Sequence, residues 1–236
     1  MNNNNALSFD KEISALYADN MAWGRSGSKI TATGLSSINN LIAIRNLVLS
    51  NKPKKTMEIG LAYGGSAATI LRTLKECHGD GQFHHTAIDP GQSNFDYCGV
   101  EIVKRGGFLE NFALFENSSD LVLPELVRLG EKYDLIYIDG YHIFENVFVD
   151  MHFSLQLLNP GGVMLFDDCA DPHVAKVLKF VKTNLSDYLK EFSVSKFQPE
   201  KSLFKKTANL LGYSQMKAYV KKRDLPRAWN AKLSAF

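Results

Sequence analysis

The chain reads Glu58-Ile59-Gly60-Leu61-Ala62-Tyr63-Gly64-Gly65-Ser66 between a short run at 55–60 and a segment at 65–76 whose apolar residues recur at helical spacing. This order predicts a strand, a tight turn and a helix. Such a turn needs glycine where a ligand approaches the backbone, and the helix N-terminus offers unpaired N–H groups. The stretch therefore predicts a ligand-binding turn, with a glycine turn required only for packing as the alternative.

The spacing of the glycines discriminates between ligands. They follow the pattern G-x-x-x-G-G, and Glu58 stands two residues before the first of them. A dinucleotide-binding turn has G-x-G-x-x-G, and a P-loop has G-K-[ST] after four spacer residues, so neither motif is present. An acidic residue ahead of the glycines suits a cationic, phosphate-free cofactor, because a carboxylate attracts an ammonium or sulfonium group.

Outward from the turn, predicted strands alternate with predicted helices. Strands are expected at 55–60, 85–89, 112–117, 133–139 and 163–168, and helices at 65–76, 96–105, 121–129, 146–158 and 173–185. The sequence Asn159-Pro160-Gly161-Gly162 is a strong breaker that should end the fourth of these helices. Alternation of this kind predicts an α/β fold, a Rossmann-like doubly wound, mostly parallel sheet with helices on both faces.

The two ends of the chain depart from this rhythm. Segments 192–197 and 215–223 alternate like strands, which predicts an antiparallel C-terminal hairpin that completes a seven-stranded sheet. Residues 1–35 are expected to be an N-terminal tail and lid segment, with a loop at 21–34 that contains Trp23 and Arg25. Residues 36–236 should form a single domain with an insert at 198–214, helical near 202–211.

Composition narrows the class of protein. The 236 residues carry a net charge of +2, with 45% hydrophobic and 22% charged residues, which is ordinary for a globular chain. Nothing in this balance indicates a nucleic-acid or membrane partner. Three scattered cysteines give neither a disulfide framework nor a zinc site, and the asparagine-rich start does not resemble a signal peptide. A reducing cytoplasm is the expected location, and a homo-oligomer is a possible assembly.

A second carboxylate strengthens the cofactor hypothesis. The strand at 85–89 ends in Ile88-Asp89-Pro90. A carboxylate at the carboxyl end of the neighbouring strand is where a doubly wound fold holds ribose hydroxyls. The alternative is that Asp89 only shapes the turn before the proline.

These motifs together resemble those of class I S-adenosylmethionine-dependent methyltransferases, over about residues 36–185. The resemblance implies that the glycines line the methionine part of the cofactor, that Asp89 holds the ribose, and that Ser118 or Ser119 reaches the adenine, unless both serines only cap the next helix. The cofactor-binding residues expected on this basis are Glu58, Gly60, Ala62, Tyr63, Gly64, Ser66, Asp89, Ser118, Ser119, Asp139 and Tyr141.

Three carboxylates gather at the ends of two predicted strands. One strand ends in Asp139-Gly140-Tyr141-His142, and the next in Asp167-Asp168. Ends of neighbouring parallel strands lie on one rim, about 4.8 Å apart, so the three aspartates should repel one another unless a cation relieves them. Mg²⁺ suits carboxylate, water and substrate oxygens. Asp139, Asp167 and Asp168 are therefore the predicted metal ligands.

This arrangement also resembles the metal-dependent O-methyltransferases, the catechol enzymes and, more closely, the macrolide-sugar enzymes. The resemblance implies that the residue three positions after the first aspartate, His142, is the general base, and that the acceptor is a hydroxylated small molecule. The macrolide-sugar enzymes have Glu-Asp where this chain has Asp167-Asp168, which makes direct coordination by the shorter Asp167 doubtful. A histidine with an ordinary pKa of about 6.5 can accept a proton near neutral pH.

Several readings remain open. A methyltransferase without metal, in which His142 acts alone, is the nearest rival, and a non-catalytic S-adenosylmethionine-binding protein is another. A nicotinamide oxidoreductase is disfavoured by the missing G-x-G-x-x-G. His142 as a loop hydrogen-bonder and Asp167-Asp168 as caps are the structural alternatives. His84 and His85 are expected to be structural, while His173 could touch substrate.

Overall fold

A computed structural model describes residues 6–199, 215–224 and 228–236. The predicted helix near 202–211 and most of the predicted insert lie outside the described residues. The α-helices are α1 (Lys11–Asp19), α2 (Ile38–Asn51), α3 (Gly65–His78), α4 (Cys98–Arg105), α5 (Ser119–Arg128), α6 (Phe144–Leu157) and α7 (Pro172–Asn184). Three short 3-10 helices are η2 (Gln92–Phe95), η3 (Leu109–Asn111) and η4 (Val194–Phe197).

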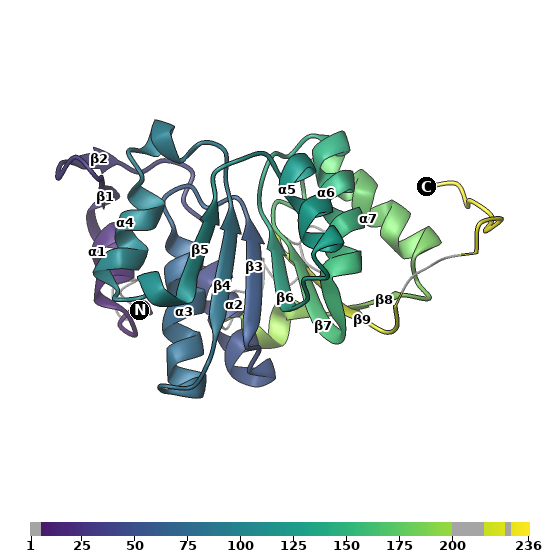
Figure 1. The fold of residues 1–236 in the computed structure, drawn as a ribbon, viewed down its shortest axis with the longest axis horizontal. Coiled ribbons are helices and arrows are strands. Elements are labelled where there is room, and N and C mark those ends of the chain that lie inside the picture. The colour runs from purple at the N-terminus through teal and green to yellow at the C-terminus, as the bar shows by residue number, and fades with distance from the viewer. Residues whose placement is uncertain (1–5, 200–214, 225–227) are drawn as a thin grey trace. The chain divides into compact units, whose positions relative to one another are not determined.

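Seven strands form the main sheet, in the order β5-β4-β3-β6-β7-β9-β8 (Figure 1). Their bounds are β3 (Lys55–Ile59), β4 (His84–Ile88), β5 (Phe112–Phe115), β6 (Tyr133–Ile138), β7 (Leu158–Phe166), β8 (Leu189–Phe192) and β9 (Lys217–Lys221). The parallel pairs β4–β5, β3–β6 and β6–β7 confirm the predicted α/β fold.

The chain divides into two compact units. The first consists of Met1–Lys54, Gly60–Ser118 and Ser195–Pro199, and the second of Lys55–Ile59, Ser119–Val194 and Glu200–Phe236. The first unit holds the glycine turn, β4, β5 and helices α1 to α4. The second holds β3, β6 to β9 and helices α5 to α7. Each is described by itself below.

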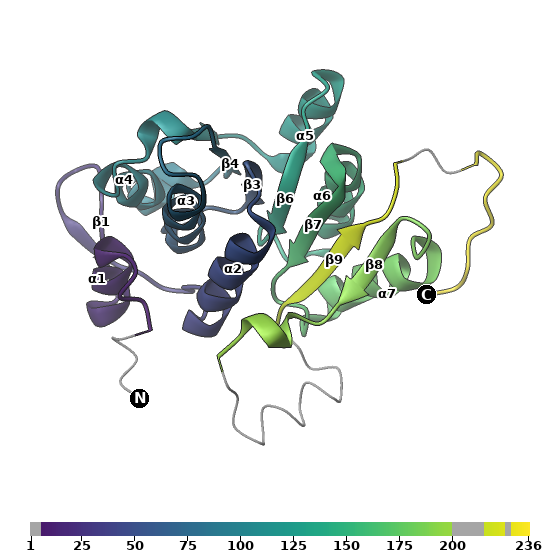
Figure 2. The same cartoon turned by 90° about the horizontal axis from the view of Figure 1, so that it is seen from below.

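In the second unit, the C-terminal hairpin is present but its first strand lies earlier than predicted. Strand β9 runs antiparallel to both β7 and β8 and lies between them (Figure 2). Residues 192–197 were expected to form the first strand, but Val194–Phe197 form a 3-10 helix and β8 ends at Phe192. The prediction failed because the alternation of apolar residues over a few positions also fits a short helical turn whose apolar residues are buried.

The breaker at Asn159-Pro160-Gly161-Gly162 also differs from its predicted role. Helix α6 ends at Leu157, as expected, but strand β7 begins at once at Leu158 and includes the breaker. Gly161 has φ +82°, and the pairing of β6 with β7 shifts register between Tyr133 and Leu135. Glycine allows this irregular stretch, which proline tolerates near a strand start. At the other end of these strands, β6 ends at Ile138 and β7 at Phe166, so Asp139 and Asp167 each follow their strand directly.

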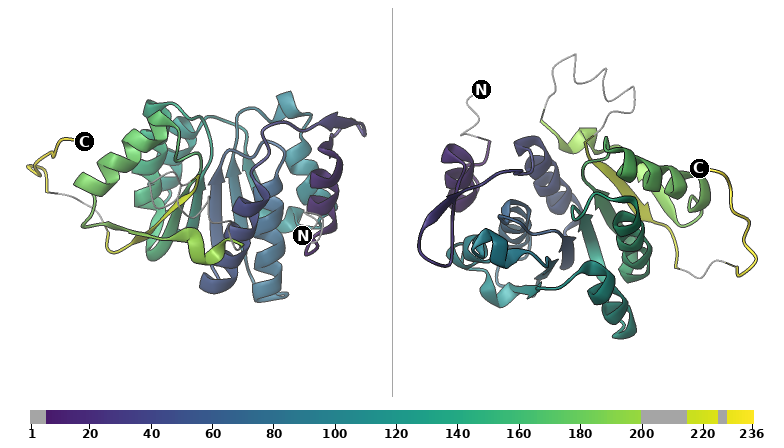
Figure 3. Two further views of the ribbon diagram at one scale, coloured as in Figure 1. Left: turned by 180° about the vertical axis from the view of Figure 1, so that it is seen from behind. Right: turned by 90° about the horizontal axis from the view of Figure 1, so that it is seen from above.

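In the first unit, residues 21–34 contain a small hairpin where a loop was expected. Strands β1 (Met21–Trp23) and β2 (Lys29–Thr31) pair antiparallel, and the hairpin and α1 pack against α4 (Figure 3). The backbone N–H of Arg25 donates to the Asp96 carbonyl at 2.7 Å, and its guanidinium lies 3.5 Å from the centre of the Tyr97 ring. These contacts dock the segment predicted to be a lid onto the residues that precede α4.

Local sequence accounts for the start of α2 and the buried face of α3. Ser37 is the N-cap of α2 and its side chain accepts the N–H of Asn40. Helix α3 buries the apolar face that includes Ala68, Leu71 and Leu74. Among the described residues, no helix has the length and apolar character needed to span a bilayer.

Candidate active site

The predicted ribose acid, Asp89, is a central acceptor of the glycine turn in the first unit. Its Oδ2 accepts the backbone N–H of Leu61 at 2.9 Å and that of Ala62 at 2.7 Å, and the side-chain amide of Gln92 at 3.1 Å. Its Oδ1 accepts the N–H of Gly91 at 2.7 Å. The side chain is 6% exposed. Asp89 therefore holds the backbone of the glycine turn in place through its Oδ2.

Gly60 and Gly64, the two glycines that define the motif, both have positive φ but make different contacts. Gly60 has φ +92° and donates its N–H to the Ile88 carbonyl at 2.9 Å. Gly64 is the N-cap of α3 with φ +75°, and a Cβ there would lie 2.8 Å from the Gly99 carbonyl oxygen. Gly64 is thus required by close packing against α4, which supports the packing explanation for this position.

The other cofactor residues predicted in the turn are mostly buried. Ser66 lies buried on α3, and Tyr63 donates its hydroxyl to the Thr31 carbonyl of the β1–β2 hairpin at 3.3 Å. Tyr63 also lines a pocket bounded by α1, the hairpin and α4. Ala62 has φ +44°, which is uncommon for a residue with a side chain. Glu58 is fully buried on β3, in the second unit.

The two serines predicted near adenine differ in their partners. The N–H of Ser118 donates to the side chain of its neighbour Asn117 at 2.8 Å. Ser119 is the first residue of α5, and its hydroxyl hydrogen-bonds the buried carboxylate of Asp150 on α6. Tyr141, predicted to face the cofactor, is exposed to 66%.

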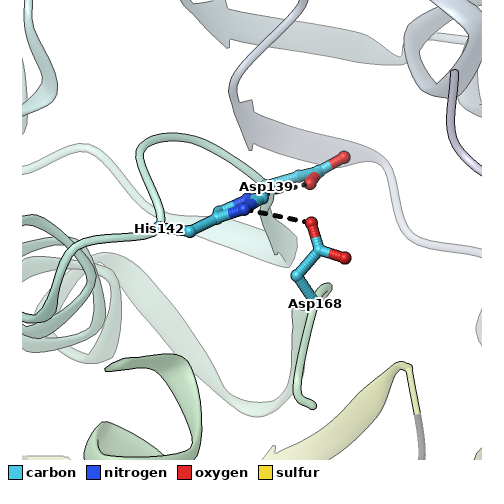
Figure 4. A group of neighbouring side chains, drawn as sticks. All are labelled: Asp139, His142 and Asp168. Carbon is cyan, nitrogen blue, oxygen red and sulfur yellow. Dashed lines mark ion pairs between the residues drawn. The ribbon is translucent and has the colours of Figure 1, made fainter. Parts of the chain in front are cut away.

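In the second unit, Asp139, His142 and Asp168 come together as predicted. His142 Nδ1 lies 3.1 Å from Asp168 Oδ2, and its Nε2 lies 3.6 Å from Asp139 Oδ1. Figure 4 shows the imidazole lying between the two carboxylates. The three residues can offer one ligand atom each within 4.8 Å of one another, the one such group among the described residues.

Asp167, the third predicted ligand, lies outside that group. Its Oδ2 accepts the hydroxyl of Tyr137 at 2.5 Å, and its Oδ1 accepts the N–H of Asp168 at 2.9 Å. The Tyr137 hydroxyl is also 3.0 Å from Asp139 Oδ2, so it bridges two carboxylates. Asp168 has a further partner in the side-chain amide of Gln215. The N-cap of α7 is Asp171, which follows the aspartate pair.

The crowding of these carboxylates shifts two pKa values. The Asp139 carboxylate, with that of Asp168, raises the pKa of His142 despite the opposing effect of burial. Burial, and then the charge of Asp139, raises the pKa of Asp167, against the hydrogen bond from Tyr137. Negative charge is therefore in excess at this rim, which is typical of sites that bind a cation or handle protons.

Three residues of the two units were missed by sequence reasoning: Tyr137, Gln92 and Asp150. Tyr137 and Asp139 are two residues apart at the end of β6, so the period of two could have placed them on one face. Gln92 and Asp150 carried no signal, since a buried glutamine on a 3-10 helix and a buried aspartate on α6 look like surface residues in sequence.

The remaining histidines have structural surroundings. His85 is fully buried and stacks on Phe112, with ring centres 6.1 Å apart. His152 lies on the exposed side of α6, next to Gln156. His173 Nδ1 accepts the N–H of Phe144 at 3.2 Å, which joins the start of α7 to the start of α6.

Residues 57–169 match the model of a family described as a methyltransferase domain. The chain carries a methyltransferase domain. The match spans the glycine turn, Asp89, Asp139, His142 and the Asp167-Asp168 pair, and it confirms the predicted class I S-adenosylmethionine-dependent methyltransferase. No curated protein matches this methyltransferase in sequence.

Solved structures have the same fold at low sequence identity. The O-methyltransferase from Bacillus cereus, in complex with SAH, is 16% identical, with a TM-score of 0.62 over 80% of this chain and 83% of that one. The O-methyltransferase TomG from Streptomyces achromogenes, in complex with SAM, is 18% identical, with a TM-score of 0.64 over 91% of each chain. These likenesses confirm the fold of the methyltransferase.

Proposed function

We propose that this methyltransferase transfers the methyl group of S-adenosylmethionine to a hydroxyl of a small molecule, with Mg²⁺ bound by Asp139 and Asp168 and with His142 as the general base. The observation that carries the proposal is the group formed by these three side chains. An isolated histidine after a strand is a common loop residue. One whose two ring nitrogens each face a carboxylate at a strand-end rim is suited to proton transfer.

The cofactor is assigned to the turn at 58–66 and to Asp89. Backbone N–H groups and a carboxylate hold this turn through bonds within the protein, which lowers the entropy lost on binding. Structures of similar fold support the assignment, because the Bacillus cereus enzyme contains SAH and TomG contains SAM.

The donor set fits a divalent cation. Two carboxylates and a histidine can each offer one ligand atom within 4.8 Å of the others, and Asp139 and Asp168 carry the oxygen atoms that Mg²⁺ prefers. When bound, Mg²⁺ supplies charge that polarises the acceptor hydroxyl and relieves the repulsion between the carboxylates. Asp167 is assigned a supporting role, because Tyr137 and the backbone of Asp168 occupy its oxygens.

The neighbours of His142 define a path for the proton. Asp168 Oδ2 can accept a hydrogen from Nδ1, which leaves Nε2 as the lone-pair nitrogen that takes the proton of the acceptor hydroxyl. The acceptor oxygen then forms a bond to the methyl carbon as the sulfonium–methyl bond breaks. The products are a methyl ether, S-adenosylhomocysteine and a proton held at His142 Nε2.

The acceptor class follows from this chemistry. A sugar, a natural-product sugar or a diol presents a hydroxyl that both a metal and a base can reach. The similar structure TomG takes part in tomaymycin synthesis, which agrees with an acceptor from secondary metabolism.

A methyltransferase that works without metal is the second candidate. It is favoured by one observation: His142 already lies between the two carboxylates, and Gln215 and His142 both engage Asp168. In that case the aspartates only orient the base.

Calorimetric titration separates the two candidates. S-adenosylhomocysteine and Mg²⁺ are titrated separately into wild type and Asp139→Ala. We expect both proteins to bind S-adenosylhomocysteine and only wild type to bind Mg²⁺. If the free protein binds Mg²⁺ weakly, the Mg²⁺ titration of both proteins is repeated with a saturating diol. Cofactor binding with no Mg²⁺ binding in either titration would favour the metal-free enzyme, and absence of cofactor binding would refute the proposed function.

A matched control is Asp187→Asn. Asp187 is an exposed carboxylate of the same unit, 3.5 Å from Arg223, and it lies far along the chain from the proposed site. Its replacement should leave the binding of both ligands unchanged, so a loss seen only in Asp139→Ala is specific to the site.

A further inference from the structure

Gln92 is a fully buried polar side chain that no part of the proposed mechanism uses. It begins the short helix η2, directly after Gly91, and it is 0% exposed. Its side-chain nitrogen donates to the Ala62 carbonyl at 2.9 Å and to Asp89 Oδ2 at 3.1 Å. One side chain thus ties the glycine turn to the acid at the end of β4.

The orientation of this amide is determined by its partners. Both atoms that face the Gln92 nitrogen, the Ala62 carbonyl oxygen and Asp89 Oδ2, are acceptors without hydrogens. Only the NH₂ group can face them, because the amide oxygen would repel both. The two hydrogens of the NH₂ group are matched to two acceptors, which is its full capacity.

The opposite end of the amide is accommodated by a glycine. A Cβ at Gly99, at the start of α4, would lie 2.9 Å from Gln92 Oε1 and 2.7 Å from the Ala62 carbonyl oxygen. The absence of a side chain at Gly99 is what allows the amide to fit between α4 and the turn. Oε1 is itself buried without a hydrogen-bond partner among the described residues. Burying an unpaired acceptor is costly, so the two donated bonds have to outweigh that cost.

Gln92 also completes the set of donors at one oxygen of Asp89. Oδ2 receives three N–H donors, from Leu61, Ala62 and Gln92. Within the described part of the chain, Oδ1 receives one, from Gly91. A carboxylate oxygen has two lone pairs. Oδ2 is therefore saturated, and Oδ1 is the atom with an acceptor site left for a ligand.

We propose that Gln92 is a positioning residue for the cofactor: its amide joins Ala62 to Asp89 Oδ2 and so directs Asp89 Oδ1 toward a single ribose hydroxyl. This inference rests on the proposed function, in which Asp89 holds the ribose. Without Gln92, Oδ2 loses one of three donors and the Ala62 carbonyl loses its partner. The carboxylate then gains freedom to rotate, and its hydrogen bond to the ribose weakens.

Two substitutions separate a donor role from simple filling of space. Gln92→Met keeps the length of the side chain but removes both donated bonds. Gln92→Glu keeps the shape but places a carboxylate against Asp89 Oδ2 and the Ala62 carbonyl. Binding of S-adenosylhomocysteine and of its 2′-deoxy and 3′-deoxy forms is measured by calorimetry for each variant, and folding is checked by thermal unfolding.

We expect wild type to bind one of the two deoxy forms about tenfold more weakly than S-adenosylhomocysteine, as suits a hydrogen bond to a charged acceptor. Gln92→Met should bind S-adenosylhomocysteine about tenfold more weakly than wild type and discriminate against that deoxy form by about threefold or less. Gln92→Glu should bind more weakly still. Ser93→Ala, an exposed neighbour on η2, serves as the control and should match wild type.

The outcomes separate this inference from the proposed function. If wild type does not bind S-adenosylhomocysteine, both are wrong. If wild type binds it and Gln92→Glu binds better than Gln92→Met, the side chain only fills space and the inference is overturned. Unchanged deoxy discrimination in a folded Gln92→Met would overturn it as well, and this result is sufficient even if Gln92→Glu does not fold.

Discussion

Asp89 and Asp139 both stand one residue after a buried strand, yet their surroundings differ. Four N–H donors surround the Asp89 carboxylate, three of them from the backbone. The Asp139 carboxylate instead shares the Tyr137 hydroxyl with Asp167 and faces His142, which a second aspartate also contacts. The Asp89 carboxylate is surrounded by N–H groups, whereas the Asp139 carboxylate lies in a cluster with two further carboxylates and a histidine.

Because their surroundings differ, the carboxylates of Asp89 and Asp139 are suited to different functions. A carboxylate held by backbone N–H groups keeps its orientation, so it suits the binding of a cofactor in a defined pose. A cluster of carboxylates is costly to form because the charges repel one another, and a cation or a proton that joins it relieves this repulsion. The surroundings of Asp89 therefore suit the binding of a ligand in one orientation, and those of Asp139 suit the binding of a cation or a proton.

The largest effect that tests the comparison is expected at His142. His142→Gln removes the base while a polar side chain remains between the carboxylates, and kcat should fall about a hundredfold or more. Binding of S-adenosylhomocysteine should be unchanged. Mg²⁺ titration of the same variant shows whether His142 is a base, in which case the metal still binds, or a metal ligand, in which case binding is lost. A kcat close to that of wild type would remove His142 from the mechanism.

A smaller effect, and one on binding, is expected at Asp89. In Asp89→Asn, one carboxylate oxygen becomes an NH₂ group that must face an N–H donor, because both oxygens accept. The unfolding free energy should fall by about 2 kcal/mol, and S-adenosylhomocysteine should bind at least about tenfold more weakly. Chemical denaturation and calorimetry measure the two changes. Full cofactor affinity in this variant would show that the turn does not depend on its acid.

The smallest effect concerns Asp150, a buried carboxylate of the second unit. Burial raises the pKa of Asp150 to about 7, although the Ser119 hydroxyl partly opposes this shift. The folded protein thus binds a proton more tightly than the unfolded chain. The stability from that proton is complete below the ordinary pKa of 3.8 and is lost as the pH rises through about 7.

Asp150→Asn should remove this dependence. Between those two pKa values, wild type should lose stability relative to the variant with a slope of at most about 1.4 kcal/mol per pH unit. Denaturation of both proteins in urea at several pH values measures the slope. If the stability of the two proteins changes with pH in parallel, the pKa of Asp150 is not raised. Among these two buried aspartates of the second unit, a raised pKa would then belong only to Asp167, beside Asp139.

Long, strongly patterned elements were predicted from sequence, whereas short ones were not. Helix α3 and strand β6 have enough apolar residues at one period to define them locally. The β1–β2 hairpin, η4 and the first residues of β7 are only a few residues long, and their conformation depends on what they pack against. Gly24, for example, is required because a Cβ there would lie 1.9 Å from Asp96 Oδ2, a residue far along the chain.

The sequence by itself determined the glycine turn and the positions of the acids that follow the strands, because these depend on short spacings along one strand and its loop. Only the tertiary structure decided that Asp168 contacts His142, whereas Asp167 accepts a hydrogen bond from Tyr137. It also decided that Gln92 donates hydrogen bonds to both Ala62 and Asp89. Such contacts depend on strand register and on the directions of buried side chains. These are set by the packing of residues distant in sequence.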